Sequence, residues 1–160
     1  MGWLLEFYSK GASPYSNASG EFRTMKVCVE ESALNTSQRA DISNQVQALV
    51  DWVNREKTLH PLLKAARFLA AFLSIQPFTE GNARVGRLLM NVILLKDGFG
   101  LVNSRFEDRT RFLDALKTFN ASGSIEPLAM LIAERALETV NDAIHIAKQK
   151  DAMRKGTILN

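Results

Sequence analysis

The segment that most limits the fold is residues 61–75, PLLKAARFLAAFLSI. Only three of its residues are polar, so a helix formed here is apolar on almost every side. Such a helix is stable in water only when other elements surround it. Pro61 suits the first turn of this helix, whereas Pro77 disfavours helical geometry at Gln76 and ends it. We therefore expect this helix to be the buried centre of a bundle.

The rest of the chain supplies further helices to surround the central one. Apolar residues recur at helical spacing, or dominate, in segments 41–56, 85–96, 107–119 and 125–148. The stretch FRTMKVCVE at 22–30 is rich in β-branched residues and predicts a strand or hairpin. The sequence thus predicts a single domain over residues 1–160 that is all-α, with at most one small β-hairpin.

Charge and composition narrow the classes of partner. Nine Lys and Arg against five Asp and Glu leave +4 on residues 61–120, which suits a phosphate-bearing ligand. Basic clusters interleaved with aromatics are missing, so nucleic acid is not expected as a partner. No apolar run reaches the roughly 20 residues that span a bilayer, so no membrane segment is expected. A lone Cys28 indicates a reducing compartment, a cytoplasm.

Residues 76–87, QPFTEGNARVGR, concentrate groups that bind phosphate. Gly81 permits backbone angles that turn successive amides into one concave space, and Asn82 tolerates the same angles. The next helix is expected to begin near Arg84, so its free N–H groups and positive dipole end face that space. Arg84 and Arg87 lie three residues apart on one face, and each can form a two-pronged contact with a phosphate.

Glu80 is the only acid in this loop. A carboxylate among anion-binding groups is understandable if it holds Mg²⁺ that bridges the phosphates. Alternatively, Glu80 pairs with Arg84 or Arg87, and the loop is an ordinary turn between two helices. The side chains and their spacing leave both interpretations open. The loop is not a Walker motif, because it lacks the Gly-Lys-Ser/Thr ending.

The order of these residues strongly resembles the signature of the Fic (Fic/Doc) family, His-Pro-Phe-x-(Asp/Glu)-Gly-Asn-(Gly/Lys)-Arg-x-x-Arg. The resemblance extends to GEFR at 20–23, HPLLKAA at 60–66 and LLMN at 88–91, and covers about residues 20–120. It implies a Fic-type helical bundle with a small β-hairpin flap. It also implies transfer of AMP from ATP to a hydroxyl group of a target protein in the cytoplasm, or in a host cytoplasm if the protein is a delivered effector.

The resemblance assigns roles residue by residue. The backbone amides of three loop residues would cradle the phosphates: Gly81, Asn82 and Ala83. Glu80 would hold Mg²⁺, Arg84 would contact the triphosphate, and Arg87 would align the terminal phosphate. The flap would bind the backbone of the target protein by strand addition through Val27, Cys28, Val29, Glu30 and Glu31.

Two residues depart from the signature. Ala83 replaces a Gly or Lys, which is a mild change, whereas Gln76 replaces the His that acts as general base. Gln76 can orient a hydroxyl but cannot accept its proton, and loss of a positioned base typically costs about 10²–10⁴-fold in rate. Neither His60, at the far end of the central helix, nor His145, on the last helix, is expected to replace it.

Several interpretations of this chain remain open. It is either an impaired adenylyltransferase or a degenerate Fic domain that binds a nucleotide, phosphate or protein without catalysis. A variant that transfers another nucleotide or phosphocholine, and an engineered Gln76, are further alternatives. The family's inhibitory pattern, (Ser/Thr)-x-x-x-Glu-(Gly/Asn), is not found, so a separate inhibitory protein stays open, as does a homo-oligomer.

Overall fold

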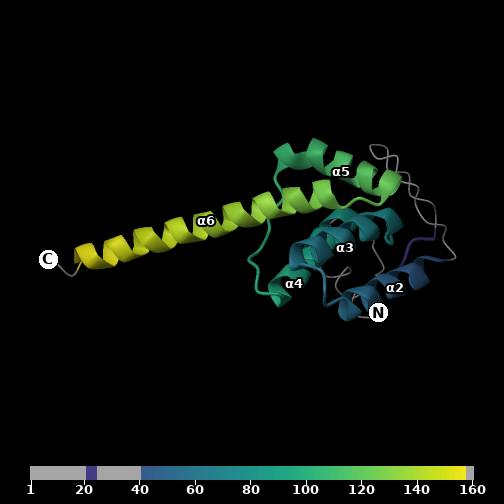
Figure 1. The fold of residues 1–160 in the computed structure, drawn as a ribbon, viewed down its shortest axis with the longest axis horizontal. Helices are drawn as coiled ribbons and strands as arrows, with labels where there is room; N and C mark the ends of the chain where they lie inside the picture. The colour runs from purple at the N-terminus through teal and green to yellow at the C-terminus, as the bar shows by residue number, and fades with distance from the viewer. Residues whose placement is uncertain (1–20, 25–40, 158–160) are drawn as a thin grey trace.

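The computed structural model describes residues 21–24 and 41–157 and shows a helical bundle (Figure 1). Its elements are α2 (Ile42–Arg55), α3 (Pro61–Ile75), α4 (Asn82–Lys96), the short 3₁₀ helix η2 (Phe106–Asp108), α5 (Arg109–Ser122) and α6 (Glu126–Thr157). Helix α3 contacts α2, α4, α5 and α6, and is therefore the centre of the bundle. The described residues contain no strand, so the prediction of an all-α fold is confirmed.

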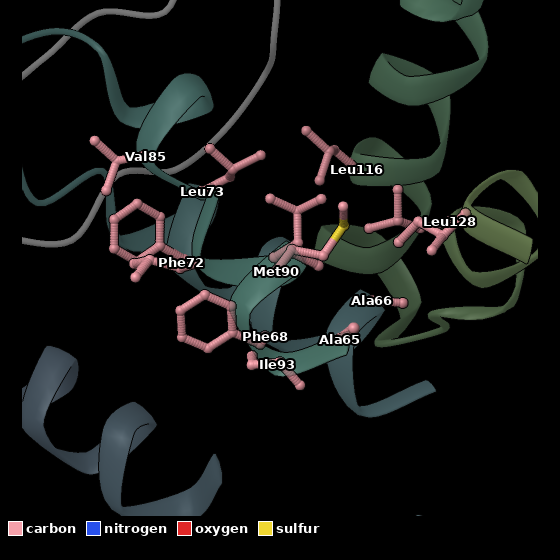
Figure 2. Packing of buried hydrophobic residues seen from close by; sticks show 14 of the residues in the cluster. Ala65, Ala66, Phe68, Phe72, Leu73, Val85, Met90, Ile93, Leu116 and Leu128 are labelled. Atoms are coloured by element: carbon pink, nitrogen blue, oxygen red, sulfur yellow. The ribbon is translucent and has the colours of Figure 1, made fainter. Parts of the chain in front are cut away.

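The core forms where the other helices meet α3 (Figure 2). The core includes Phe72 and Leu73 from α3, Met90 from α4 and Leu128 from α6, and each is at most 2% exposed. Helices α3 and α4 approach closely at Gly86, where an added Cβ would lie only 3.0 Å from Leu69 Cδ1. The glycine in this part of the loop motif thus serves packing between the two helices that carry the site.

The start of the central helix agrees with the sequence prediction, whereas α4 begins earlier and α6 ends later than predicted. Helix α3 begins at Pro61, and the backbone N–H of Leu62 donates to His60 Nδ1 at 3.3 Å, so His60 caps the start of the helix. Helix α4 begins at Asn82, slightly before the predicted start near Arg84 or Val85, because the Gly81 carbonyl accepts the first bonds of the turn. Helix α6 continues to Thr157 instead of residue 148.

The predicted strand at 22–30 lies mostly outside the described residues. Only its first residues, Phe22 to Thr24, are described, and they have irregular backbone. No helix in the described ranges is long and apolar enough to cross a membrane.

A buried ion pair joins the segment before α5 to α6. Arg135 Nε and Nη2 donate to the two carboxylate oxygens of Asp108, each at 2.6 Å, and Arg135 Nη1 also contacts Glu138. These hydrogen bonds to Arg135 lower the pKa of Asp108 below its usual range. The carboxylate therefore stabilises the folded state only while it is charged.

We expect the free energy of unfolding to decrease on acidification through this group. The contribution of Asp108 is complete above its unfolded pKa of about 3.9 and is lost as the pH falls through the lower folded pKa. The free energy of unfolding, measured with urea from neutral pH to below the unfolded pKa of Asp108, should depend less on pH in Asp108→Asn than in the original chain. The exposed carboxylate of Asp114, paired with Lys117, provides the control, since Asp114→Asn should keep the original profile.

Candidate functional site

The end of α3 places Gln76 in an unusual conformation. Its φ of 49° and ψ of 62° are left-handed, and it is the only non-glycine residue with positive φ among those described. Its backbone N–H donates to the Phe72 carbonyl at 3.0 Å, and the residue is only 7% exposed. Pro77 ends the helix as predicted, but the left-handed turn was not foreseen. Such strained residues persist only where surrounding structure holds them, and they cluster at functional sites.

Arg23 holds the backbone around Gln76. Its Nε donates to the Gln76 carbonyl at 2.6 Å and its Nη2 to the Ile75 carbonyl at 3.2 Å. The Arg23 backbone N–H donates to the Pro77 carbonyl at 2.9 Å. The side chain is buried, and burial lowers its pKa from the ordinary arginine value. Segment 21–24, far from the loop in sequence, therefore positions the residue at the end of α3.

Sequence analysis assigned no role to Arg23, although it is the last residue of the GEFR stretch at 20–23. The signal that could have identified it is its place in the GEFR stretch, which the family resemblance already included. Nothing in the spacing indicates that this guanidinium reaches the end of a helix more than fifty residues later. Only the fold brings the two together.

Phe78 and Asn82 fix the shape of the loop. Asn82 Oδ1 accepts from the Phe78 backbone N–H at 2.9 Å, and Asn82 Nδ2 donates to the Phe78 carbonyl at 2.7 Å. The Phe78 ring is fully buried, with its centroid 5.8 Å from that of Phe22 and 6.4 Å from that of Phe72. The Asn82 side-chain amide is thus engaged with the loop itself, and any ligand contact by Asn82 would come from its backbone N–H.

The first turn of α4 presents backbone amides next to this loop. Gly81 has a φ of 74°, and its carbonyl accepts from the N–H groups of Arg84 and Val85, both at 3.0 Å. The amides of Asn82 and Ala83 come before these and have no acceptor within the helix, as expected for a first turn. With the positive end of the helix dipole, they form an arrangement that favours an anion.

Two arginines flank this turn, as the sequence predicted. Arg84 is exposed, whereas Arg87, one turn further, is half-buried. Burial, and then the nearby charge of Arg84, lower the pKa of Arg87 from its ordinary value. No carboxylate within the described ranges forms an ion pair with Arg87, so its charge is not neutralised by them. A dianionic or polyanionic ligand would relieve the repulsion between the two guanidinium groups.

Arg87 also faces a cavity of about 230 Å³ between α4, α5 and α6. Its lining includes apolar groups such as Met90 and Phe112 together with Arg105 and Arg109. The sequence did not indicate this cavity, because its walls come from segments that are distant along the chain. It gives Arg87 room for a ligand that reaches past the start of α4.

Glu80 is exposed in the loop immediately before Gly81. No group of three or more His, Cys, Asp or Glu residues that could hold a metal occurs within the described part of the chain. Mg²⁺, however, is usually bound through one or two carboxylates together with the phosphates of a substrate. A single carboxylate beside an anion-binding turn fits that mode of binding, and does not fit a metal site built by protein alone.

The structure thus brings together Gln76, Glu80, Gly81 and the first turn of α4 at one end of the bundle. The predicted flap residues, Val27 to Glu31, lie outside the described residues. His60 caps the opposite end of α3, and His145 is exposed on α6, where its Nε2 lies 2.9 Å from Gln149 Nε2. Neither histidine lies at the loop, so neither replaces a base at residue 76.

These features define a class of protein: a helical bundle whose two central helices are joined by a loop with the geometry and charge suited to an anion. Comparison with known proteins agrees. The Fic/DOC family profile matches residues 2–94, more than half of the chain. The chain belongs to the Fic/DOC family.

Individual relatives support the same assignment. Protein adenylyltransferase Fic of Nematostella vectensis is 34% identical over 125 residues, which are 77% of this chain and 29% of that protein. A solved structure of Fic-1 from C. elegans has a TM-score of 0.78 and 28% identity, covering 92% of this chain and 43% of that one. A Fic domain containing signaling protein from Bacteroides thetaiotaomicron shares the fold, with a TM-score of 0.78 at 21% identity, covering 92% of this chain and 63% of that one.

Proposed function

We propose that this chain binds Mg²⁺·ATP and supports transfer of AMP to a hydroxyl group of a target protein, with a rate limited by Gln76. One observation carries the proposal. The amides of the first α4 turn lie together with Arg84 and Arg87, and this group follows the buried, left-handed Gln76 within a few residues of the chain. The names of relatives agree with this chemistry. The chain spans only part of the length of those relatives, so the reaction remains a proposal for this protein.

In the proposed reaction the target hydroxyl attacks the α-phosphorus of ATP. A new O–P bond forms, the bond between the α-phosphorus and its bridge to the β-phosphate breaks, and pyrophosphate leaves. The amides near Gly81 to Ala83 and the charges of Arg84 and Arg87 would hold the triphosphate in line for this attack. Mg²⁺, held by Glu80 and the phosphates, would neutralise part of the triphosphate charge. The target would bind at residues 27–31.

Residue 76 does not provide a base for the hydroxyl proton. The Gln76 amide can accept a hydrogen bond and orient the hydroxyl, but it does not take up a proton near neutral pH. The proton therefore leaves to water, without a positioned base. Because the binding groups do not depend on residue 76, nucleotide binding should persist where transfer is slow.

The missing base also supports a second candidate function, a binding module that holds a nucleotide or a target protein without transfer. Two observations favour it. Hydrogen bonds of Arg23, Phe78 and Asn82 hold the loop in one conformation, while residue 76 carries no titratable group. The two functions share the phosphate site. They differ only in whether AMP is transferred from ATP to a protein.

We expect calorimetry to detect binding of Mg²⁺·ATP that depends on the arginines of α4. Removing charge-assisted hydrogen bonds in Arg87→Ala should weaken binding by about 10- to 100-fold, from a loss of about 1.5–3 kcal/mol. Arg55→Ala, at the exposed end of α2, is the matched control and should leave affinity unchanged. No binding by the unaltered chain would exclude both adenylyl transfer and a nucleotide-binding module, and equal affinity in Arg87→Ala would show that the phosphates bind elsewhere.

A further inference from the structure

Helix α6 runs past the end of the bundle (Figure 1). Every residue from Val140 to Arg154 is exposed. Apolar residues nevertheless continue along this helix at alternating spacings of three and four. We call the following set the outer stripe: Met130, Ala133, Leu137, Val140, Ile144 and Ala147. This spacing is the a/d repeat by which one helix packs lengthwise on another.

The outer stripe is separate from the face of α6 that packs on the bundle. The buried face is formed by Leu128 and Ile132, which are at most 4% exposed. At 100° per residue, the centre of the outer stripe lies roughly 130° around the helix from that face. Its large members stay exposed, with Leu137 at 62% and Ile144 at 47%. Helix α6 is therefore apolar on two faces, and the described part of the chain covers only one.

The charges of α6 are divided between its two halves. Residues 126–142 carry four acids and one Arg, whereas residues 143–155 carry four Lys and Arg and one acid. Counted on the helix alone, the first half is −3 and the second half is +3. Two acids of the first half, Glu134 and Glu138, also pair with Arg111 and Arg105, which reduces the negative charge there. If the α6 helices of two chains lie antiparallel, the acidic half of each helix lies along the basic half of the other.

We propose that the outer stripe binds a second copy of this chain, with the two α6 helices antiparallel. A two-fold axis near Asp142 sets the register. Val140 then packs against Ile144 of the second copy, and Leu137 against Ala147, so a large residue meets a smaller one. The same register brings Glu134 beside Lys148 of the second copy. A parallel arrangement would instead place acid beside acid and base beside base along the whole overlap.

The pairing does not require the helix to be formed on association. The first half of α6 is already packed in the bundle, and the second half continues it, so little ordering entropy opposes the dimer. The proposal is independent of the phosphate site, because no residue of the outer stripe belongs to the loop or to the first turn of α4. Failure of nucleotide binding would leave the dimer prediction unchanged.

Two isoleucines provide a matched test of the stripe. Ile144 lies on it, whereas Ile146 lies on the opposite side of the helix, and they are 47% and 50% exposed. Sedimentation of the 160-residue chain should show a reversible monomer–dimer equilibrium. Ile144→Glu, which acts twice in a symmetric dimer, should weaken it by more than about 100-fold. Ile146→Glu should leave it unchanged. A chain that stays monomeric up to about 100 µM, or equal effects of both variants, would overturn the proposal.

Orientation is tested by cross-linking in a Cys28→Ser background. In the antiparallel register, Asn141 lies near the axis and faces its own copy, whereas Ala133 faces residue 151. A short bis-maleimide should therefore join Asn141→Cys chains efficiently and Ala133→Cys chains poorly. Efficient joining of Ala133→Cys would indicate a parallel pair and would refute the proposed register.

Discussion

Gln76→His is expected to raise AMP transfer from α-labelled ATP to protein by about 10²–10⁴-fold, while the affinity for Mg²⁺·ATP changes little. The imidazole would supply a group that accepts the hydroxyl proton near neutral pH, which the amide cannot do. The groups proposed to bind phosphate lie on the loop and on α4 and do not include the side chain of residue 76. The substitution should therefore act on the chemical step and not on binding.

The backbone at residue 76 accommodates this change. Its left-handed conformation is held by Arg23 and by the hydrogen bond to Phe72, whatever side chain is present. Histidine, with Asn and Asp, is several-fold enriched among non-glycine residues at positive φ. We thus expect Gln76→His to fold normally, with unfolding by urea close to that of the original chain.

Gln76→Asn is the matched control for the base. Asparagine suits the left-handed conformation and keeps an amide, so it should bind nucleotide without any gain in transfer. Label incorporation into lysate proteins, with calorimetry alongside, separates the outcomes. Rapid transfer by the unaltered chain would show that a positioned base at residue 76 is unnecessary. Binding without transfer in Gln76→His would favour the binding-module function.

Phe78→Ala is expected to lower the free energy of unfolding by about 3–5 kcal/mol. The Phe78 ring is fully buried between Phe22 and Phe72, so its loss leaves a cavity under the loop. The Phe78 backbone N–H donates to Asn82 Oδ1 and its carbonyl accepts from Asn82 Nδ2, so a loosened ring would loosen these contacts as well. Urea unfolding followed by far-UV circular dichroism measures the effect.

Phe106→Ala is the control for this substitution, because Phe106 is 83% exposed and truncating it should change stability by less than about 0.5 kcal/mol. Nucleotide affinity adds a second readout. If the buried ring positions the loop, Phe78→Ala should also weaken Mg²⁺·ATP binding at temperatures where the protein is still folded. A stability change as small as that of Phe106→Ala would mean that the ring is not an anchor of the loop.

Much of the site could be predicted from local sequence. The central helix was predictable because an almost wholly apolar segment has to be surrounded, and its end because Pro77 follows. The turn at Gly81 and the arginines of α4 were predictable because they depend on neighbours within one helical turn. The family's motif order then connected these local features to nucleotide chemistry.

Features that depend on distant contacts were not predictable in this way. Arg23 donates to the carbonyl of the left-handed Gln76 across more than fifty residues of sequence, and the cavity beside Arg87 has walls from α4, α5 and α6. The hydrogen bonds between the Asn82 side-chain amide and the Phe78 backbone were also not predicted. The predicted flap at Val27 to Glu31 stays a prediction.

By itself, the sequence determined an all-α bundle around residues 61–75 and a loop suited to phosphate, because hydrophobic periodicity, Pro, Gly and helix starts act over a few residues. Tertiary structure decided how Gln76 is held, which side chains are already engaged, and which face of α6 is left uncovered. These three features depend on hydrogen bonds and burial between segments that meet only after folding. The spacing of residues along the chain does not indicate which distant segments will meet.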